Sequence, residues 1–213
     1  SLFSAFLLLL LFCLLFGLAL LKNQRRKEII IIVYLILSIS FDYISEHVMD
    51  WFGLSTNFHI HNMWSFIEFI VLWIFYFQIL DIKRIKIIHW ISLVSFISIC
   101  ILVLLFYQSI FEIIKVHKIF SAIYYSFLSV YLYFQFLNKL DTHLLRKSLF
   151  WQNSAFFIYF TGNILMFLMV DYMFLGDIGL LNSWAIHNIL TIIKALGLII
   201  AFYINTRYYS ENR

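Results

Sequence analysis

The sequence contains no proline among its 213 residues, and only 12% of those residues are charged. Because proline is a common cause of sharp helix kinks, its absence predicts fairly straight helices and removes proline hinges as a gating device. Soluble domains carry about a quarter charged residues, so the low charge points away from a soluble protein. The two cysteines, Cys13 and Cys100, lie within hydrophobic segments, which argues against a disulfide framework or a cysteine-based metal site.

Hydrophobic residues are abundant and make up 64% of the chain. Leu, Ile and Phe form continuous runs long enough to cross a bilayer, which takes about 20 apolar residues. A continuous pattern favours helices over the alternating pattern of a barrel. Seven transmembrane helices are predicted, at 2–21, 29–49, 62–80, 87–107, 117–137, 149–171 and 184–206. The sequence therefore predicts an all-α, polytopic membrane protein, a seven-helix bundle in which residues 1–213 form a single transmembrane domain in the lipid bilayer.

The basic residues predict the orientation of these helices. Twelve of them follow the odd-numbered spans: Lys22, Arg25, Arg26, Lys27, Lys83, Arg84, Lys86, Lys139, Arg146, Lys147, Arg207 and Arg213. The opposite side has only Lys115 and Lys118, and Lys194 falls inside a span. By the positive-inside rule, the N-terminus lies outside and the C-terminus lies in the cytoplasm. This topology accounts for the net charge of +4, so no nucleic-acid partner is expected.

A polar motif occurs twice, as HNMWSFIE at 61–68 and as HNILTIIK at 187–194. Its spacing places four polar residues of each copy on one helix face. They are His61, Asn62, Ser65 and Glu68 in the first copy and His187, Asn188, Thr191 and Lys194 in the second. A helix rises 1.5 Å per residue, so each charge lies about 10 Å below its histidine. Because both spans run inward from the outside, we predict that Glu68 and Lys194 lie at similar depth and form an ion pair.

This predicted ion pair is the centre of a candidate ligand site. A charge in the middle of a transmembrane helix costs about 2.5–3.5 kcal/mol on the insertion scale, so such residues usually face the bundle and pair. The two polar stripes, together with Asp42 of the second span, are predicted to line an outward-facing pocket. The equal direction of spans three and seven also suggests 3+1+3 parallel repeats, although a match this short also arises by chance.

Histidines and acidic residues gather near the predicted outer face. The candidate metal ligands there are His47, His59, His61, His187 and Glu46. The His59-x-His61 spacing at a helix entry is a weaker metal signal than a helical His-x-x-x-His pair. Polar residues at membrane ends are ordinary, so a solvated surface explains the same residues without a metal. No cofactor is predicted.

The stretches FWQNSAFFIYFTGNILMFLM (150–169) and SWAIHNILTIIKALGLIIAFY (183–203) carry a family resemblance. They are similar to short, uncharacterised seven-helix inner-membrane proteins of bacteria, which often accompany or are fused to sensor histidine kinases. The resemblance implies a sensory input module in the bacterial inner membrane, with a histidine kinase as its protein partner. No catalytic motif comes with the resemblance, and no kinase segment is present in the sequence, so any output lies in a partner chain.

The resemblance and the repeated motif together favour a non-enzymatic sensory or ligand-binding module, with four alternatives left open. The repeat also fits a small 3+1+3 transporter. Lys194 and Glu68 fit a retinal-binding, rhodopsin-like photoreceptor with retinal on Lys194, but Leu190 stands where that family has an aspartate. The histidines and acids fit a metal-dependent membrane hydrolase. The apolar surface fits an accessory subunit of a larger membrane complex.

Overall fold

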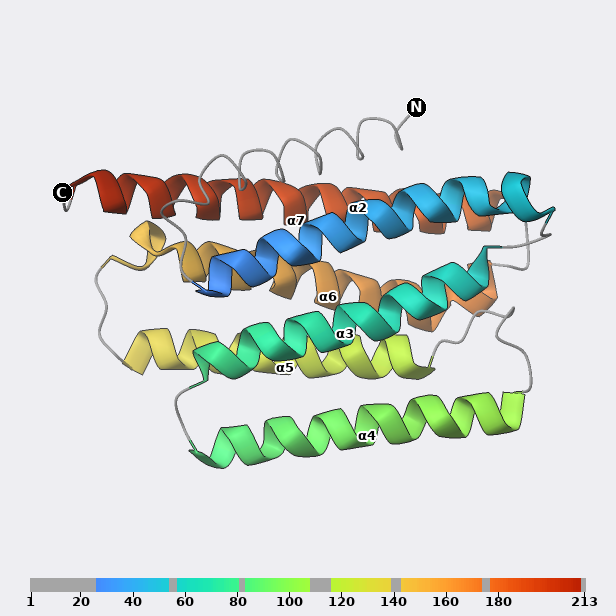
Figure 1. The fold of residues 1–213 in the computed structure, drawn as a ribbon, viewed down its shortest axis with the longest axis horizontal. Coiled ribbons are helices and arrows are strands. Elements are labelled where there is room, and N and C mark those ends of the chain that lie inside the picture. Colours follow the sequence, from blue (N-terminus) through green and yellow to red (C-terminus); the bar gives the residue numbers. More distant parts are fainter. Residues whose placement is uncertain are drawn as a thin grey trace. The chain divides into compact units, whose positions relative to one another are not determined.

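The computed structural model describes residues 26–53, 57–80, 83–107, 116–138, 143–173 and 177–211, and within these ranges all regular structure is helical. The helices are α2 (Arg26–Phe52), α3 (Phe58–Ile79), α4 (Lys83–Tyr107), α5 (Val116–Asn138), α6 (Ser148–Met173) and α7 (Asp177–Glu211), with the short η2 (Leu144–Arg146) before α6 (Figure 1). A helix satisfies its backbone groups internally, which an apolar solvent requires. The prediction of an all-α chain is confirmed.

Five helices are long and apolar enough to cross a membrane, among the residues that the structure describes. Their apolar spans are Lys27–His47, His59–Ile79, Ile85–Val103, Val116–Asn138 and Ala185–Arg207. They coincide with the predicted spans at 29–49, 62–80, 87–107, 117–137 and 184–206, so the chain is a multi-pass membrane protein. The predicted span at 149–171 also forms a helix, α6, in which Gln152 and Asn153 are buried. The predicted span at 2–21 lies outside the described residues.

The chain divides into two compact units, and the division falls between Ser121 and Ala122, inside α5. The first, Arg26–Ser121, is called the α2–α4 unit, and the second, described from Ala122 onward, is called the α6–α7 unit. Each is described by itself. The prediction that residues 1–213 form a single transmembrane domain stays a prediction.

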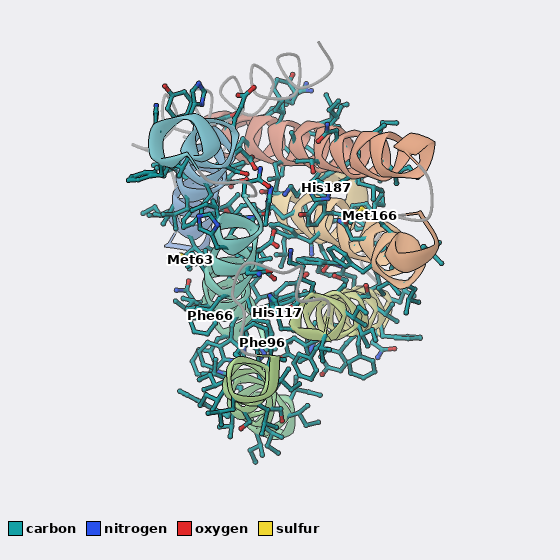
Figure 2. The ribbon with its side chains drawn as sticks, turned by 90° about the vertical axis from the view of Figure 1, so that its right-hand side faces the viewer. Met63, Phe66, Phe96, His117, Met166 and His187 are labelled. Carbon is teal, nitrogen blue, oxygen red and sulfur yellow. The ribbon has the colours of Figure 1, made fainter. Side chains whose placement is uncertain are left out.

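In the α2–α4 unit, α3 packs between α2 and α4. Ser45 of α2 contacts His61 near the start of α3. Tyr34, earlier in α2, contacts Glu68, later in α3, so these two helices run antiparallel. Trp73 of α3 contacts His89 of α4, and Phe69, which precedes Trp73, contacts Phe96, which follows His89, so α3 and α4 also run antiparallel. Phe69 and Phe96 stack across the α3–α4 contact with ring centroids 3.7 Å apart (Figure 2 labels Phe96).

Aromatic packing also brings the first turns of α5 against this unit. The ring of Phe120 lies 6.3 Å from that of Phe69 and 6.2 Å from that of Phe96. The imidazole of His117 meets Phe96 edge-on at 6.3 Å (Figure 2). The start of α5 therefore lies level with the middle of α3, where Glu68 is located.

In the α6–α7 unit, small residues allow α6 and α7 to approach closely. A Cβ atom added at Gly197 of α7 would lie 2.8 Å from Cβ of Ala155 in α6, so a larger residue does not fit there. On its other side α6 is joined to α5 by a hydrogen bond from Asn153 Nδ2 to the Ser129 carbonyl oxygen at 3.0 Å. Small residues at helix contacts and polar side chains that bond across helices are typical of membrane bundles.

Candidate functional site

The carboxylate of Glu68 lies in the interior of the α3 span and is only 9% exposed. The hydroxyl group of Tyr34, on α2, donates a hydrogen bond to Glu68 Oε1 at 2.8 Å. Lys118, in the first turn of α5, lies near enough for its ammonium group to attract the same carboxylate. An acid buried in an apolar span therefore has a hydrogen-bond donor and a basic neighbour within its own unit.

A second group of polar contacts lies toward the N-terminal end of α3. His61 Nε2 is 2.9 Å from Ser45 Oγ. Asn57, which precedes α3, donates from Nδ2 to the Ser45 carbonyl oxygen at 3.0 Å and to Ser45 Oγ at 2.9 Å. His61 also interacts electrostatically with Lys118 and with His59. These contacts tie the start of α3 to α2, about two helical turns before Glu68.

The polar stripe predicted on α3 lies on the packed face of the helix. Asn62, Ser65 and Glu68 are buried, and His61 is half-buried. Met63 and Phe66, which lie between them in the sequence, are exposed. This alternation agrees with the predicted shared face, because positions 0, +1, +4 and +7 lie on one side of a helix. Whether these residues bind a ligand stays a prediction.

The second copy of the motif makes its contacts with α6. His187 Nδ1 donates to Asn163 Oδ1 at 2.9 Å, and Asn163 Nδ2 donates in turn to the Tyr159 carbonyl oxygen at 2.8 Å. The Thr191 hydroxyl donates to the His187 carbonyl oxygen of its own helix at 2.9 Å. The ammonium of Lys194, which is 1% exposed, lies 3.8 Å from the centre of the Tyr159 ring. Such a contact attracts the cation to the negative face of the ring.

The predicted ion pair joins residues of different units. Glu68 belongs to the α2–α4 unit and Lys194 to the α6–α7 unit, so their pairing stays a prediction from the sequence. Asn188 on α7 and Asp42 on α2 are half-buried. Their assignment to a ligand site also stays a prediction.

Metal binding by the candidate ligands His47, His59, His61, His187 and Glu46 stays a prediction. Within the described ranges, no three His, Cys, Asp or Glu side chains form a group that could hold a metal ion. His47 Nδ1 donates instead to the Tyr43 carbonyl oxygen at 2.9 Å, and Glu46 is exposed. His59 and His61 lie near each other, as their spacing predicts.

Sequence reasoning missed the residues that contact the motif from other helices. They are Tyr34, Ser45, Asn57, Lys118 and Tyr159. The sequence offered one signal for Lys118, because a lysine near the outer end of a span departs from the positive-inside pattern. No spacing rule singled out the other four, because contacts between helices depend on their packing.

Comparisons with protein families, with curated proteins and with solved structures found no match to this chain. Its function is therefore inferred from the polar residues around Glu68 on α3 and around Lys194 on α7.

Proposed function

We propose that the chain is a membrane-embedded sensory or ligand-binding module that signals to, or assembles with, a partner protein. The polar residues around Glu68 and around Lys194 receive a small polar ligand from the outer side of the membrane. The observation that carries the proposal is the buried Glu68 carboxylate, with the Tyr34 hydroxyl at 2.8 Å and the Lys118 ammonium near it.

The energetic cost of this arrangement supports a functional role. A charged side chain inside a span costs about 2.5–3.5 kcal/mol on the insertion scale. Burying an acid with a base does not by itself stabilise a protein, because the desolvation of both charges can exceed their attraction. Apolar residues of similar size would fill the same volume without that cost. Intramembrane ionisable residues are accordingly functional candidates by default.

The contacts of Glu68 also provide a means of signalling. Its carboxylate lies on α3, its hydroxyl donor on α2 and its basic neighbour on α5. A polar ligand that binds Glu68 or Lys118 competes with these contacts and so favours a different arrangement of the three helices. A ligand shifts such an equilibrium only by its difference in affinity between the two arrangements. His61, joined to Ser45, adds a further polar contact between α3 and α2.

The proposal includes the finer features predicted from the sequence. The architecture is a seven-helix bundle with the N-terminus outside, the C-terminus in the cytoplasm and 3+1+3 parallel repeats. The protein resides in the bacterial inner membrane, and its output passes through the segment at 139–148 and the C-terminal tail. A histidine kinase is the partner that the family resemblance suggests.

A ligand screen on the full chain in lipid nanodiscs tests the proposal. Small polar molecules are screened for a rise in melting temperature, first with the unmodified protein and then with Glu68→Gln. Glu46→Gln is the matched control, because Glu46 is an exposed acid on α2 of the same unit. We expect a ligand that stabilises the unmodified protein and the control but not Glu68→Gln.

Folding of each variant is checked first by size-exclusion chromatography and circular dichroism. If Glu68→Gln does not fold, Lys118→Met takes its place in the screen. A ligand shift that survives both substitutions would place the site elsewhere. The absence of any stabilising ligand from a broad panel would count against a ligand-binding module.

A further inference from the structure

The α3–α4 hairpin carries an aromatic cluster near its connecting turn. Trp73 Nε1 donates to the His89 carbonyl oxygen at 2.9 Å, and His89 Nε2 donates to the Trp73 carbonyl oxygen at 2.8 Å. The two rings stack with centroids 4.6 Å apart. Both side chains are buried, so this reciprocal pair fixes the two helices against each other.

An exposed tryptophan lies against this fixed pair. Trp90 is 51% exposed, and its ring meets Trp73 edge-on at 4.7 Å and Phe77 at 5.9 Å. The ammonium of Lys86 lies 5.4 Å from the centre of the Phe77 ring. The exposed indole of Trp90 and the ammonium of Lys86, which contacts the Phe77 ring, are thus located at the same end of the hairpin.

Their depth corresponds to the lipid headgroup region. The apolar span of α4 is Ile85–Val103, so Lys86 lies at its edge and Trp90 about 6 Å deeper along the helix. Tryptophan is enriched at this level, where its ring lies among the headgroups, and lysine extends its ammonium toward the headgroup phosphates. The chain from 81 to 86 carries Lys83, Arg84 and Lys86 against the single acid Asp81, which leaves a positive charge at this end.

We propose that this end of the α3–α4 hairpin binds an anionic phospholipid. Lys86 contacts the phosphate, and the exposed edge of Trp90 lies against the glycerol and upper acyl chain. Positive charge at the membrane edge complements an anionic headgroup, which is the basis for choosing a lipid as the occupant. The acyl chains have a surface to cover, because only 17% of the α4 span is buried and the exposed residues include Ile87, Ile91 and Val94.

Fluorescence quenching by brominated lipids tests this proposal. The full chain is placed in phosphatidylcholine vesicles that contain increasing amounts of brominated phosphatidylglycerol or, in parallel, brominated phosphatidylcholine. The signal of Trp90 is the difference between the unmodified protein and Trp90→Phe, which keeps an aromatic ring in the cluster. We expect half-maximal quenching at a mole fraction about fivefold lower for the anionic lipid, since each basic residue near an anionic surface contributes about a fivefold preference.

Two charge variants separate a specific site from general surface charge. Lys86→Gln should remove most of the preference. Arg146→Gln is the matched control, because Arg146 is an exposed basic residue that is not part of this cluster. Equal quenching of Trp90 by the two lipids in the unmodified protein would overturn the proposal. So would an equal loss of preference in the two charge variants. The test does not involve Glu68. The lipid proposal can therefore fail while the ligand-binding proposal holds, and the ligand-binding proposal can fail while the lipid proposal holds.

Discussion

Replacing Tyr34 by phenylalanine removes the hydroxyl group that donates to Glu68 and leaves the aromatic ring in place. Tyr34 is fully buried and Glu68 is 9% exposed, so water has little access to replace the lost donor. A hydrogen bond to a charged group contributes about 1.5–3 kcal/mol, and the 2.8 Å distance is typical of a hydrogen bond between a hydroxyl group and an oxygen acceptor. We expect Tyr34→Phe to lower the free energy of unfolding by about 1.5–3 kcal/mol. The free energy of unfolding is measured by titrating the protein in mixed micelles with dodecyl sulfate.

Two comparisons isolate the contribution of this hydrogen bond. Tyr43→Phe, on the same helix but 49% exposed, should change the free energy of unfolding by less than about 0.5 kcal/mol. In a Glu68→Gln background the effect of Tyr34→Phe should shrink by about 1 kcal/mol or more, because the charged acceptor is gone. Equal losses from Tyr34→Phe in the two backgrounds, or equal losses from the two tyrosine substitutions, would refute this account of the Glu68 site.

Three further predictions follow from other parts of the chain. Gly197→Val should destabilise the protein by about 1–3 kcal/mol in the same titration, because the new Cβ would lie 2.8 Å from Cβ of Ala155. An unchanged midpoint of the titration would contradict the close approach of α6 and α7. Lys194→Met should impair folding or signalling, and combining it with Glu68→Gln should be milder than either change alone, whereas strictly additive effects would show that the two charges do not interact. A tag at the C-terminus should be protected from membrane-impermeant reagents in intact cells, and its labelling there would reverse the predicted topology.

The helical architecture was predictable because it depends on composition and on hydrophobic run length. The predicted span at 117–137 lies within α5, Val116–Asn138, and the span at 29–49 lies within α2, Arg26–Phe52. The helices extend past the predicted ends, since polar residues beyond the apolar core also complete helical turns. Two polar residues inside the predicted span at 149–171, Gln152 and Asn153, are fully buried, and Asn153 bonds to the backbone of α5. Periodicity alone does not reveal which polar residues a neighbouring helix will cover.

The polar stripe on α3 was predictable from spacing, but its partners were not. Spacing along one helix fixes which of its residues share a face, and the burial of Asn62 and Ser65 agrees with that rule. The meeting of Tyr34 with Glu68 depends on the register between two helices. Side-chain packing sets that register; the rings of Phe41 and Trp64, for example, lie 5.4 Å apart. Such contacts leave no pattern in a single sequence.

The position of Lys118 shows why a search for the partner of a buried charge needs the heights of the helices. From the sequence, Glu68 and Lys194 are predicted to lie at similar depth, and their pairing stays a prediction, whereas Lys118 stands at the outer edge of the next inward-running span. The contact between Phe69 and Phe120 places the first turns of α5 level with Glu68, near enough for the Lys118 ammonium to attract that carboxylate. A lysine near the start of a span is therefore a candidate partner for an acid in the middle of another whenever the two helices are offset along the membrane normal.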